Sequence, residues 1–424
     1  MKKISLFIIV AAAFAGCGPE LSDPGFSSGN LDANRYLTMN ATMGSGFQDF
    51  ELYVTAETNS YGAIMARQLE SVGRGEFNTH YMVDDVGFGK RRELGTSVDC
   101  NGDSSLAPVL MGTPVNSQNF NSPQDSAVIH QIGIPGLRVA DMFNSNLDQA
   151  NPYYGRMQYS GIEKPLDFII QAKASLFTLW FTDDVLNYSL AGGTGSSLTA
   201  EADFEANLDS VLNRLTITAT GGALATIPDF MNYPYFNLIP GDALVLTQDQ
   251  ADMLNLLYIL NPEVSFQEGP NYFVIQDGNT QRHMTSEERL MLSLNLDSVK
   301  CEQYGSATPF ADVDVLTEAE ISEIQDRRIA LNNIIRAKAD EYKLAVVEMD
   351  ELMLTLFNEG IQTDGISISA DFVTGGFFSL DGLNPSQRGH ALIANEFIEA
   401  LNTKYQAKIP LANPVNFPSV FLPN

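Results

Sequence analysis

Short apolar runs alternate along this chain with longer segments that carry apolar residues at helical spacing. The run Ser175–Phe181 (SLFTLWF) is nearly continuous and holds β-branched and aromatic residues, a pattern typical of a central strand in a parallel sheet. Similar patterns predict strands in three more segments, RYLTMN (35–40), GALATIPDF (222–230) and LAVVEM (344–349).

Three segments between these runs are predicted as amphipathic helices, because apolar residues recur in them every three or four positions. They span 60–73, 202–215 and 316–342. The last begins with a capping box, since Thr317 is followed three residues later by Glu320. The apolar stripes are Ile64, Met65 and Leu69; Phe204, Leu208, Val211 and Leu212; and Ile321, Ile324, Leu331 and Ile335.

This alternation of strands and helices predicts an α/β fold with a mostly parallel central sheet. Long stretches rich in Gly, Asn and Pro interrupt the pattern near 75–128, 188–200 and 262–312. Such stretches lie on the loops of a sheet, where binding surfaces form. We therefore expect one domain over residues 35–424, with its main insertions near 75–128 and 262–312.

The first 17 residues are predicted to be an export signal. Lys2 and Lys3 precede an apolar run that is too short for a stable membrane-spanning helix, and small residues follow it. The run ends in FAGC, which resembles a bacterial lipobox, so we expect Cys17 to carry a lipid; an ordinary cleavable signal is the alternative. Gly18 after the cysteine favours sorting to the outer membrane, where the protein would face either the periplasm or the cell surface. Residues 18–34 are predicted to form a flexible tether.

Charge and cysteine content narrow the classes of function. The 424 residues carry a formal net charge of -28, and a polyanionic surface repels phosphate backbones, so we expect no nucleic-acid partner. Apart from Cys17, Cys100 and Cys301 form an even pair suited to a disulfide in an oxidising compartment; two separate buried thiols are the alternative. Because no C-x-x-C or H-x-x-x-H spacing occurs, we expect no metal or other cofactor.

Four loops are expected beyond the carboxyl ends of the strands, where sites of α/β sheets form. They are Met39–Phe50, Gly133–Gly136, Phe181–Asn187 and Ser379–Pro385. Residues in these four loops are therefore the candidates for binding or catalysis.

The blocks resemble the GDSL/SGNH hydrolase family, in particular a lipoprotein subfamily of Bacteroidetes-type bacteria. The resemblance runs from about Phe26 to the C-terminus, and it implies an SGNH-hydrolase-like (flavodoxin-like) three-layer sandwich around a parallel sheet. It rests on these blocks in order: SSGNLDANRYLTMN, NSYGAIMARQL, IGIPGLRVADM, FTLWFTDDVLNYSLAGG, ATIPDFMNYPYF, FVTGGFFSLDGLNPSQRGHALIANEFI and AKIPLANPVNFPSVFLPN.

The first two blocks of the family hold the nucleophile and part of the oxyanion site. The alignment places Thr42 where active members have a nucleophilic Ser. A Thr hydroxyl needs a base to attack a carbonyl, so a Thr that caps the following turn is the simpler interpretation. Ser45 is the other candidate hydroxyl, although its use shifts the alignment. Gly133 matches the glycine whose backbone N–H helps to bind the oxyanion.

The third and fourth blocks also depart from the family pattern. Asp183 stands where active members have an oxyanion-binding Asn, and an ionised carboxylate has no donor to offer. Asp381 matches the carboxylate that orients the base, but Asn384 replaces the general-base His, and an amide takes up no proton. We expect Asp381 to cap the final helix. We expect His390, the nearest imidazole, to be an ordinary helix histidine that is hydrogen-bonded or exposed.

Replacement of the nucleophile, the oxyanion donor and the base together predicts a pseudo-enzyme. The expected role is that of a lipid-anchored outer-membrane protein that serves as a binding or scaffold subunit for a lipid or glycan. The resemblance implies an outer-membrane β-barrel as partner. One alternative is an ester hydrolase that pairs a hydroxyl with His390 or a carboxylate. A weaker one is a metal site made of Asp183, Asp184 and Asp381.

Overall fold

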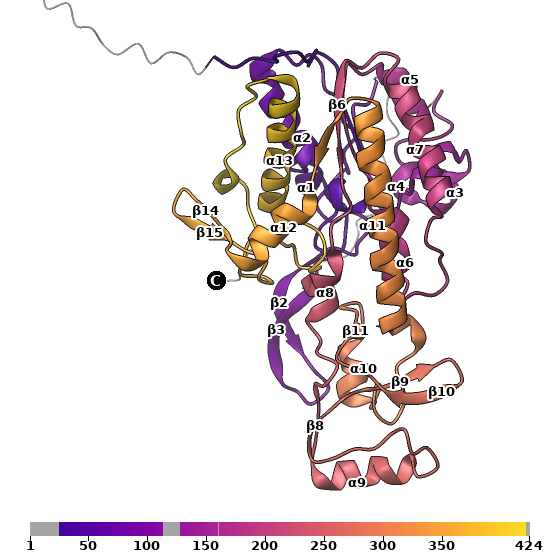
Figure 1. The fold of residues 1–424 in the computed structure, drawn as a ribbon. Coiled ribbons are helices and arrows are strands. Elements are labelled where there is room, and N and C mark those ends of the chain that lie inside the picture. Colours follow the sequence, from indigo (N-terminus) through magenta and orange to yellow (C-terminus); the bar gives the residue numbers. More distant parts are fainter. Residues whose placement is uncertain (1–24, 113–127, 160, 421–424) are drawn as a thin grey trace, which may run out of the picture.

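The computed structural model describes residues 25–112, 128–159 and 161–420 (Figure 1). The expected export signal with Cys17, and the first part of the tether, lie outside the described residues. Within the described part, no helix combines the length and the apolar character that crossing a membrane requires.

Five parallel strands form the central sheet, in the order β13-β6-β5-β1-β4. Every residue of β1, β4, β5 and β6 is buried, as expected of strands covered on both faces. The order is that of flavodoxin-like folds, in which sites form where the connections change direction, here beside β1. The strands are β1 (Tyr36–Asn40), β4 (Gln131–Gly133), β5 (Leu176–Trp180), β6 (Gly221–Ala225) and β13 (Ala345–Val347).

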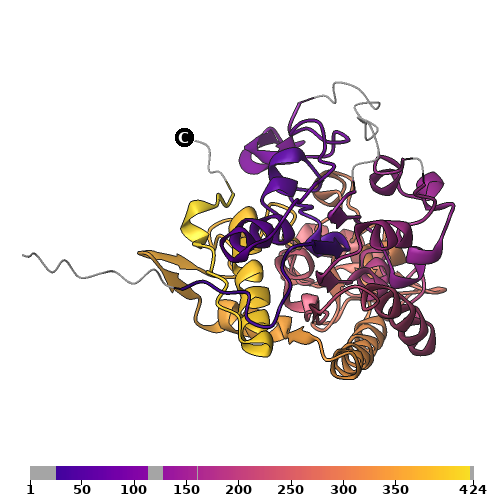
Figure 2. The ribbon, with the colours of Figure 1, turned by 90° about the horizontal axis from the view of Figure 1, so that it is seen from above.

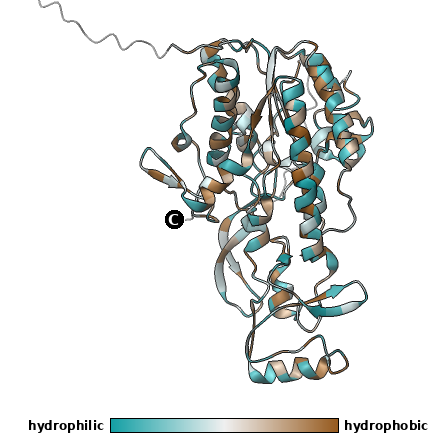
Figure 3. Ribbon diagram, in the orientation of Figure 1, coloured by the Kyte–Doolittle hydropathy of each residue, from teal (hydrophilic) through white to brown (hydrophobic). Residues whose placement is uncertain are grey.

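Helices cover both faces of this sheet and complete three layers (Figures 1 and 2). On one face, α2 (Tyr61–Leu69) packs against α13 (Gln387–Tyr405). Figure 3 shows hydrophilic and hydrophobic residues alternating along these helices, as one-sided burial requires. The other face carries α5 (Leu166–Ala172), α6 (Asp183–Leu190), α7 (Glu201–Leu215) and α11 (Glu318–Glu341).

The sequence-based expectation of an α/β fold with a central parallel sheet is confirmed. The predicted capping box starts α11, because the Thr317 hydroxyl accepts the backbone N–H of Glu320 while the Glu320 carboxylate accepts that of Thr317. Two predicted strands are shorter than expected. β6 ends at Ala225, ahead of Pro228, and β13 ends at Val347, where Thr226 and the start of α12 take over the hydrogen bonding.

Residues 238–316, called the arm here, extend from the carboxyl end of the sheet (Figure 1). The arm is wider than the predicted insertion at 262–312, because it includes a helix that sequence reasoning did not identify. Two small apolar clusters of its own hold it together. Its elements are β7 (Leu244–Leu246), α9 (Gln248–Leu257), β8 (Gly269–Asn271), β9 (Val274–Asp277), β10 (Thr280–His283), β11 (Arg289–Leu290), α10 (Leu296–Cys301) and β12 (Val315–Leu316).

A hairpin from the first predicted insertion leans toward the arm and is bonded to it. Its strands β2 (Arg92–Val98) and β3 (Ser104–Leu110) pair antiparallel. Cys100, in the turn of the hairpin, forms a disulfide with Cys301 at the end of α10. Beside it, the ammonium group of Lys300 lies 3.4 Å from the Asp99 carboxylate.

Smaller elements connect these parts. They are α1 (Val54–Thr58), α3 (Leu147–Ala150), α4 (Pro152–Gly155), α8 (Pro234–Asn237), α12 (Met349–Asn358), β14 (Ile361–Thr363) and β15 (Ile366–Ile368), together with 3-10 turns at Thr42–Gly44, Glu70–Val72, Val139–Phe143, Phe230–Asn232, Asp312–Asp314 and Pro414–Asn416.

Candidate functional site

The candidate site lies where β1 and β5 end side by side. Asn40, the last residue of β1, is opposite Trp180 of β5 and Gly133 of β4. The chain therefore brings Thr42 and Asp183, which follow these strands, to the same point at the edge of the sheet.

Thr42 and Asp183 bond to each other twice. The Thr42 hydroxyl donates to Oδ1 of Asp183 over 2.5 Å, and the Thr42 backbone N–H donates to Oδ2 over 2.8 Å. The backbone N–H of Gly136 donates to the same Thr42 hydroxyl over 2.9 Å. Thr42 is 7% exposed and Asp183 is 0% exposed. The Thr42 hydroxyl therefore does not cap the following turn, contrary to the expectation from sequence. Instead it joins two other segments inside the protein.

Burial governs the ionisation of Asp183. Removal from water raises its pKa from 3.8 to about 7, although the hydrogen bonds from Thr42 and Thr182 oppose this shift. Near neutral pH the carboxyl group is therefore partly protonated. The sequence alone does not set this ionisation state, because the burial that shifts the pKa of Asp183 depends on the packing of distant segments.

Asp184 has a different partner. Its Oδ2 accepts the backbone N–H of Val139 over 2.9 Å, and burial raises its pKa to about 6. Among the described residues, no group of three or more His, Cys, Asp or Glu side chains is placed to hold a metal ion. The hypothesised site of Asp183, Asp184 and Asp381 is therefore not assembled in this part of the chain.

Gly133 and Ser45 are fixed by packing against each other. A Cβ atom placed on Gly133 would lie 2.8 Å from the Cα atom of Ser45, so only glycine fits between them. Ser45 is buried, and its hydroxyl donates to the Thr42 carbonyl over 2.8 Å and accepts the Phe47 N–H over 3.1 Å. The Ser45 hydroxyl therefore has structural partners of its own.

Asp381 and Asn384 form a closed turn. The Asp381 carboxylate accepts the backbone N–H of Asn384 over 2.7 Å, its side-chain amide over 3.0 Å, and the N–H of Leu383 over 3.0 Å. The expectation that Asp381 caps the final helix was wrong, because Ser386 accepts the Gly389 N–H at the start of α13. Burial raises the pKa of Asp381, and the nearby Asp49 adds to this effect.

The two pairs do not form one catalytic set. The Asn384 side-chain amide donates to Asp381, whereas the Thr42 hydroxyl is bonded to Asp183 and Gly136. Residues that flank both pairs, among them Met43, Leu383 and Pro385, line a small apolar cavity instead of a polar cleft.

His390 differs from its expected environment. It is neither exposed nor hydrogen-bonded, because its side chain is 0% exposed and neither ring nitrogen has a partner in the described part of the chain. Burial lowers its pKa from 6.5 to about 3, so the imidazole is neutral at physiological pH. No contact among the described residues links His390 to the Thr42 hydroxyl.

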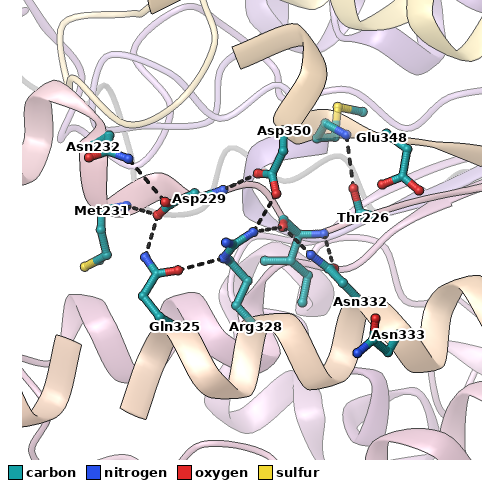
Figure 4. Close-up of polar contacts among 12 residues, drawn as sticks. Thr226, Asp229, Met231, Asn232, Gln325, Arg328, Asn332, Asn333, Glu348 and Asp350 are labelled. Atoms are coloured by element: carbon teal, nitrogen blue, oxygen red, sulfur yellow. Dashed lines mark hydrogen bonds and ion pairs between the residues drawn. The ribbon is translucent and has the colours of Figure 1, made fainter. Parts of the chain in front are cut away.

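Sequence reasoning missed a polar network at the carboxyl ends of β6 and β13 (Figure 4). Arg328 of α11 forms an ion pair with Asp350 over 2.7 Å and donates to Gln325. Gln325 donates to Asp229 over 2.6 Å, and the Asp229 N–H donates to Asp350. Asn332 binds both the N–H and the carbonyl of Ile227. The only signal was the spacing of Gln325, Arg328 and Asn332 on one side of a predicted helix. The network fastens α11 to the loop after β6.

An open groove of about 850 Å³ runs beside the Thr42–Asp183 pair. Gly136, whose N–H contacts Thr42, is part of its wall, and Asn187 donates to the Gly136 carbonyl there. The rest of the lining is predominantly polar: Arg138, Asp141, Asn144, Leu147, Ala150, Asn151, Gly195, Ser196 and Ser197.

Comparisons with known proteins give structural similarity to esterases and lipases at low identity. An acetylxylan esterase, Axe2 from Geobacillus stearothermophilus, aligns with a TM-score of 0.37 and 10% identity over 89% of this chain and 98% of that chain. A GDSL-like lipase from Parabacteroides merdae gives 0.36 and 10% over 88% and 98%. An extracellular lipase from Streptomyces rimosus gives 0.33 and 9% over 87% and 98%.

No protein-family description matches this chain, and no curated protein matches it. At these identities and TM-scores the structural alignments say nothing about activity. The fold assignment rests on the strand order and the three layers.

Proposed function

We propose that this chain is a non-catalytic binding protein with an SGNH-hydrolase-like fold, held at the outer membrane by a lipid on Cys17. The observation that supports this most is that the Thr42 hydroxyl is hydrogen-bonded within the protein. The hydroxyl donates to Asp183 and accepts from Gly136, so both of its roles are used inside the protein.

The chemistry that remains is poor for ester hydrolysis. Asn384 is not a base, and loss of a general base costs roughly 10²–10⁴ in rate. The Asp183 oxygens accept hydrogen bonds from Thr42 and Thr182 and face no oxyanion, and loss of one oxyanion donor costs about 10²–10³ in rate. Thr42 and Asp183 are also almost fully buried, so an ester carbonyl has no direct approach.

The groove beside Gly136 suits a polar ligand better than an acyl chain. The side-chain amide of Asn144 and the hydroxyls of Ser196 and Ser197 line this groove, and such groups pair with the hydroxyls of a glycan. Binding of a glycan at this groove, with an outer-membrane β-barrel as partner, is the role that we assign.

The deciding experiment is an ester-hydrolysis assay with p-nitrophenyl acetate and butyrate, on the purified protein and on Thr42→Ala. We expect the same background rate for both. Turnover that Thr42→Ala abolishes would overturn the proposal. Mild detergent extraction should then recover the lipoprotein together with a membrane barrel, whereas Cys17→Ala should release it from the membrane fraction.

One observation favours a second candidate, a hydrolase with Thr42 as nucleophile and Asp183 as base. The carboxylate lies 2.5 Å from the hydroxyl, and a pKa of about 7 suits a general base. This candidate predicts activity that rises between pH 6 and 8 and is lost in Asp183→Asn. The Thr42→Ala assay separates the two proposals.

A further inference from the structure

The helix α9 at the end of the arm carries two apolar stripes. The inner stripe, Ala251, Leu254 and Tyr258, is buried in the apolar cluster of the arm that also holds Val264 and Phe266. An amphipathic helix on a small protein normally has one such stripe and a polar outer face. The outer face of α9 departs from this rule.

The outer stripe is exposed to solvent. Leu256 and Leu257 lie three and four residues after Met253 on α9, and Leu260 lies seven residues after it, in the turn that follows the helix. These four side chains are 72% (Met253), 70% (Leu256), 59% (Leu257) and 94% (Leu260) exposed. Val245 and Ile259 lie close in sequence and are each 70% exposed. Single exposed apolar residues are ordinary, but a contiguous group of this size marks an interaction surface.

The charged residues nearest to this stripe in the sequence are all acidic. From residue 215 to residue 281 the sequence contains no Lys, Arg or His. Asp249 and Asp252 lie on α9 itself, Glu263 follows it closely, and Asp242 and Glu268 lie at the two ends of the same segment. The outer stripe is therefore an apolar surface with an acidic border.

The acidic residues beside the stripe indicate which kind of surface could bind it: a membrane, a second copy of this chain or another protein. Helices that lie on membranes carry Lys and Arg on their polar face, to meet anionic headgroups, and α9 has none. A second copy of the chain would bring carboxylates against carboxylates on a protein of net charge -28. A protein whose apolar groove is bordered by Lys and Arg complements both features.

We propose that α9 and the turn after it dock into an apolar groove with a basic border on a partner protein, by Met253, Leu256 and Leu257 of the helix and Leu260 of the turn. This is the helix-in-groove mode, in which anchors recur at i, i+3, i+4 and i+7. The proposal rests on the binding role proposed above and names the chemistry of the partner. The disulfide between Cys100 and Cys301 and the small cores of the arm hold α9 away from the body, where a partner reaches it (Figure 1).

The test uses a photo-crosslinking amino acid at Leu257 of the full-length chain in intact cells. The control site is Ile217, which is also 70% exposed but lies on the body after α7. We expect one protein adduct from Leu257 and none of that mass from Ile217. The crosslinked peptide of the partner should contain Lys or Arg next to apolar residues.

Two double variants should change the yield of the crosslinked adduct. Leu256→Ser with Leu260→Ser should lower the adduct yield at least tenfold with an unchanged melting curve, because these side chains support no packing. Asp249→Asn with Asp252→Asn should lower the yield several-fold, and added salt should do the same to the wild type. An adduct of twice the chain mass, a lipid adduct, equal capture from Ile217, indifference to salt, or no adduct would overturn the proposal.

This outcome is independent of the ester-hydrolysis assay. If the chain hydrolyses esters and the adduct still forms, the docking surface stands and the non-catalytic role falls. If neither hydrolysis nor an adduct is seen, the docking surface falls and the non-catalytic role stands.

Discussion

The hydroxyl of Thr42 and the carboxyl group of Asp183, which follow two neighbouring parallel strands, meet over 2.5 Å in the interior of the protein. In active members of the family that the sequence resembles, these two positions hold the nucleophile and an oxyanion donor. Here the two side chains are hydrogen-bonded to each other, and this contact joins the loop after β1 to the start of α6. Its contribution to stability is therefore open to measurement.

Replacement of Thr42 by Val should destabilise the protein by about 1–3 kcal/mol, because the half-buried Gly136 N–H loses its acceptor and the buried Asp183 loses a donor. The measurement is urea unfolding at pH 7. Thr216→Val is the matched control. The hydroxyl of Thr216 donates only to Leu212 in its own helix, so a change of at most about 0.5 kcal/mol is expected there. Equal effects of the two substitutions would refute a special role of the Thr42 contact.

Asp183 should make the protein more stable in mild acid. Its pKa is raised to about 7 in the folded protein, against 3.8 ordinarily, so between these values the folded protein holds a proton that the unfolded chain has released. Its contribution to the free energy of unfolding is therefore complete below about pH 4 and declines as the pH rises to about 7.

Denaturant unfolding of wild type and Asp183→Asn from pH 4 to 8 measures this contribution. The advantage of the wild type should shrink up to about pH 7 and then stay constant. Asp184→Asn is the comparison, because the pKa of Asp184 is raised to about 6 and its curve should level off earlier. Parallel curves at all pH values would contradict the shifted ionisation.

His390 should make the protein less stable in acid, opposite to the effect of Asp183. Because its pKa is lowered from 6.5 to about 3, the unfolded chain takes up a proton below pH 6.5 that the folded protein does not. The free energy of unfolding therefore falls as the pH falls from about 6.5 to about 3. His390→Leu should be neutral or stabilising at pH 7.5 and should reduce this loss in acid.

The matched control for His390 is His283→Leu. The ring nitrogens of His283 bond to Tyr272 and Ser265 in the arm, so its replacement should destabilise the arm at pH 7.5. A His390→Leu variant that melts well below the wild type would show that the imidazole has a partner.

The disulfide should add about 2–4 kcal/mol to the free energy of unfolding, since Cys100 and Cys301 are 201 residues apart. Cys100→Ser with Cys301→Ser should lower the urea midpoint, and reduction of the wild type should match it. Proteolysis of the double variant should begin in the arm and the hairpin. An unchanged midpoint would mean that non-covalent contacts alone hold the arm.

Local sequence patterns predicted the sheet well, because strands such as SLFTLWF are buried on both faces and appear as apolar runs. The pairing of Thr42 with Asp183 could not be predicted, since it depends on register between strands that are 140 residues apart. The ionisation of Asp183 and the burial of His390 depend on packing from several segments. The helix α9 was missed because apolar residues on both of its sides left no clear amphipathic signal.

The bond between Cys100 and Cys301 also has a topological consequence. It closes a covalent ring that contains β4, β5 and β6, whereas β1 and β13 lie outside this ring. In the sheet, however, β1 lies between β4 and β5, so the strand that positions Thr42 is held between two strands of one closed ring. A single nick anywhere from residue 101 to residue 300 therefore separates no fragment, and the nicked chain retains its full mass until the bond is reduced.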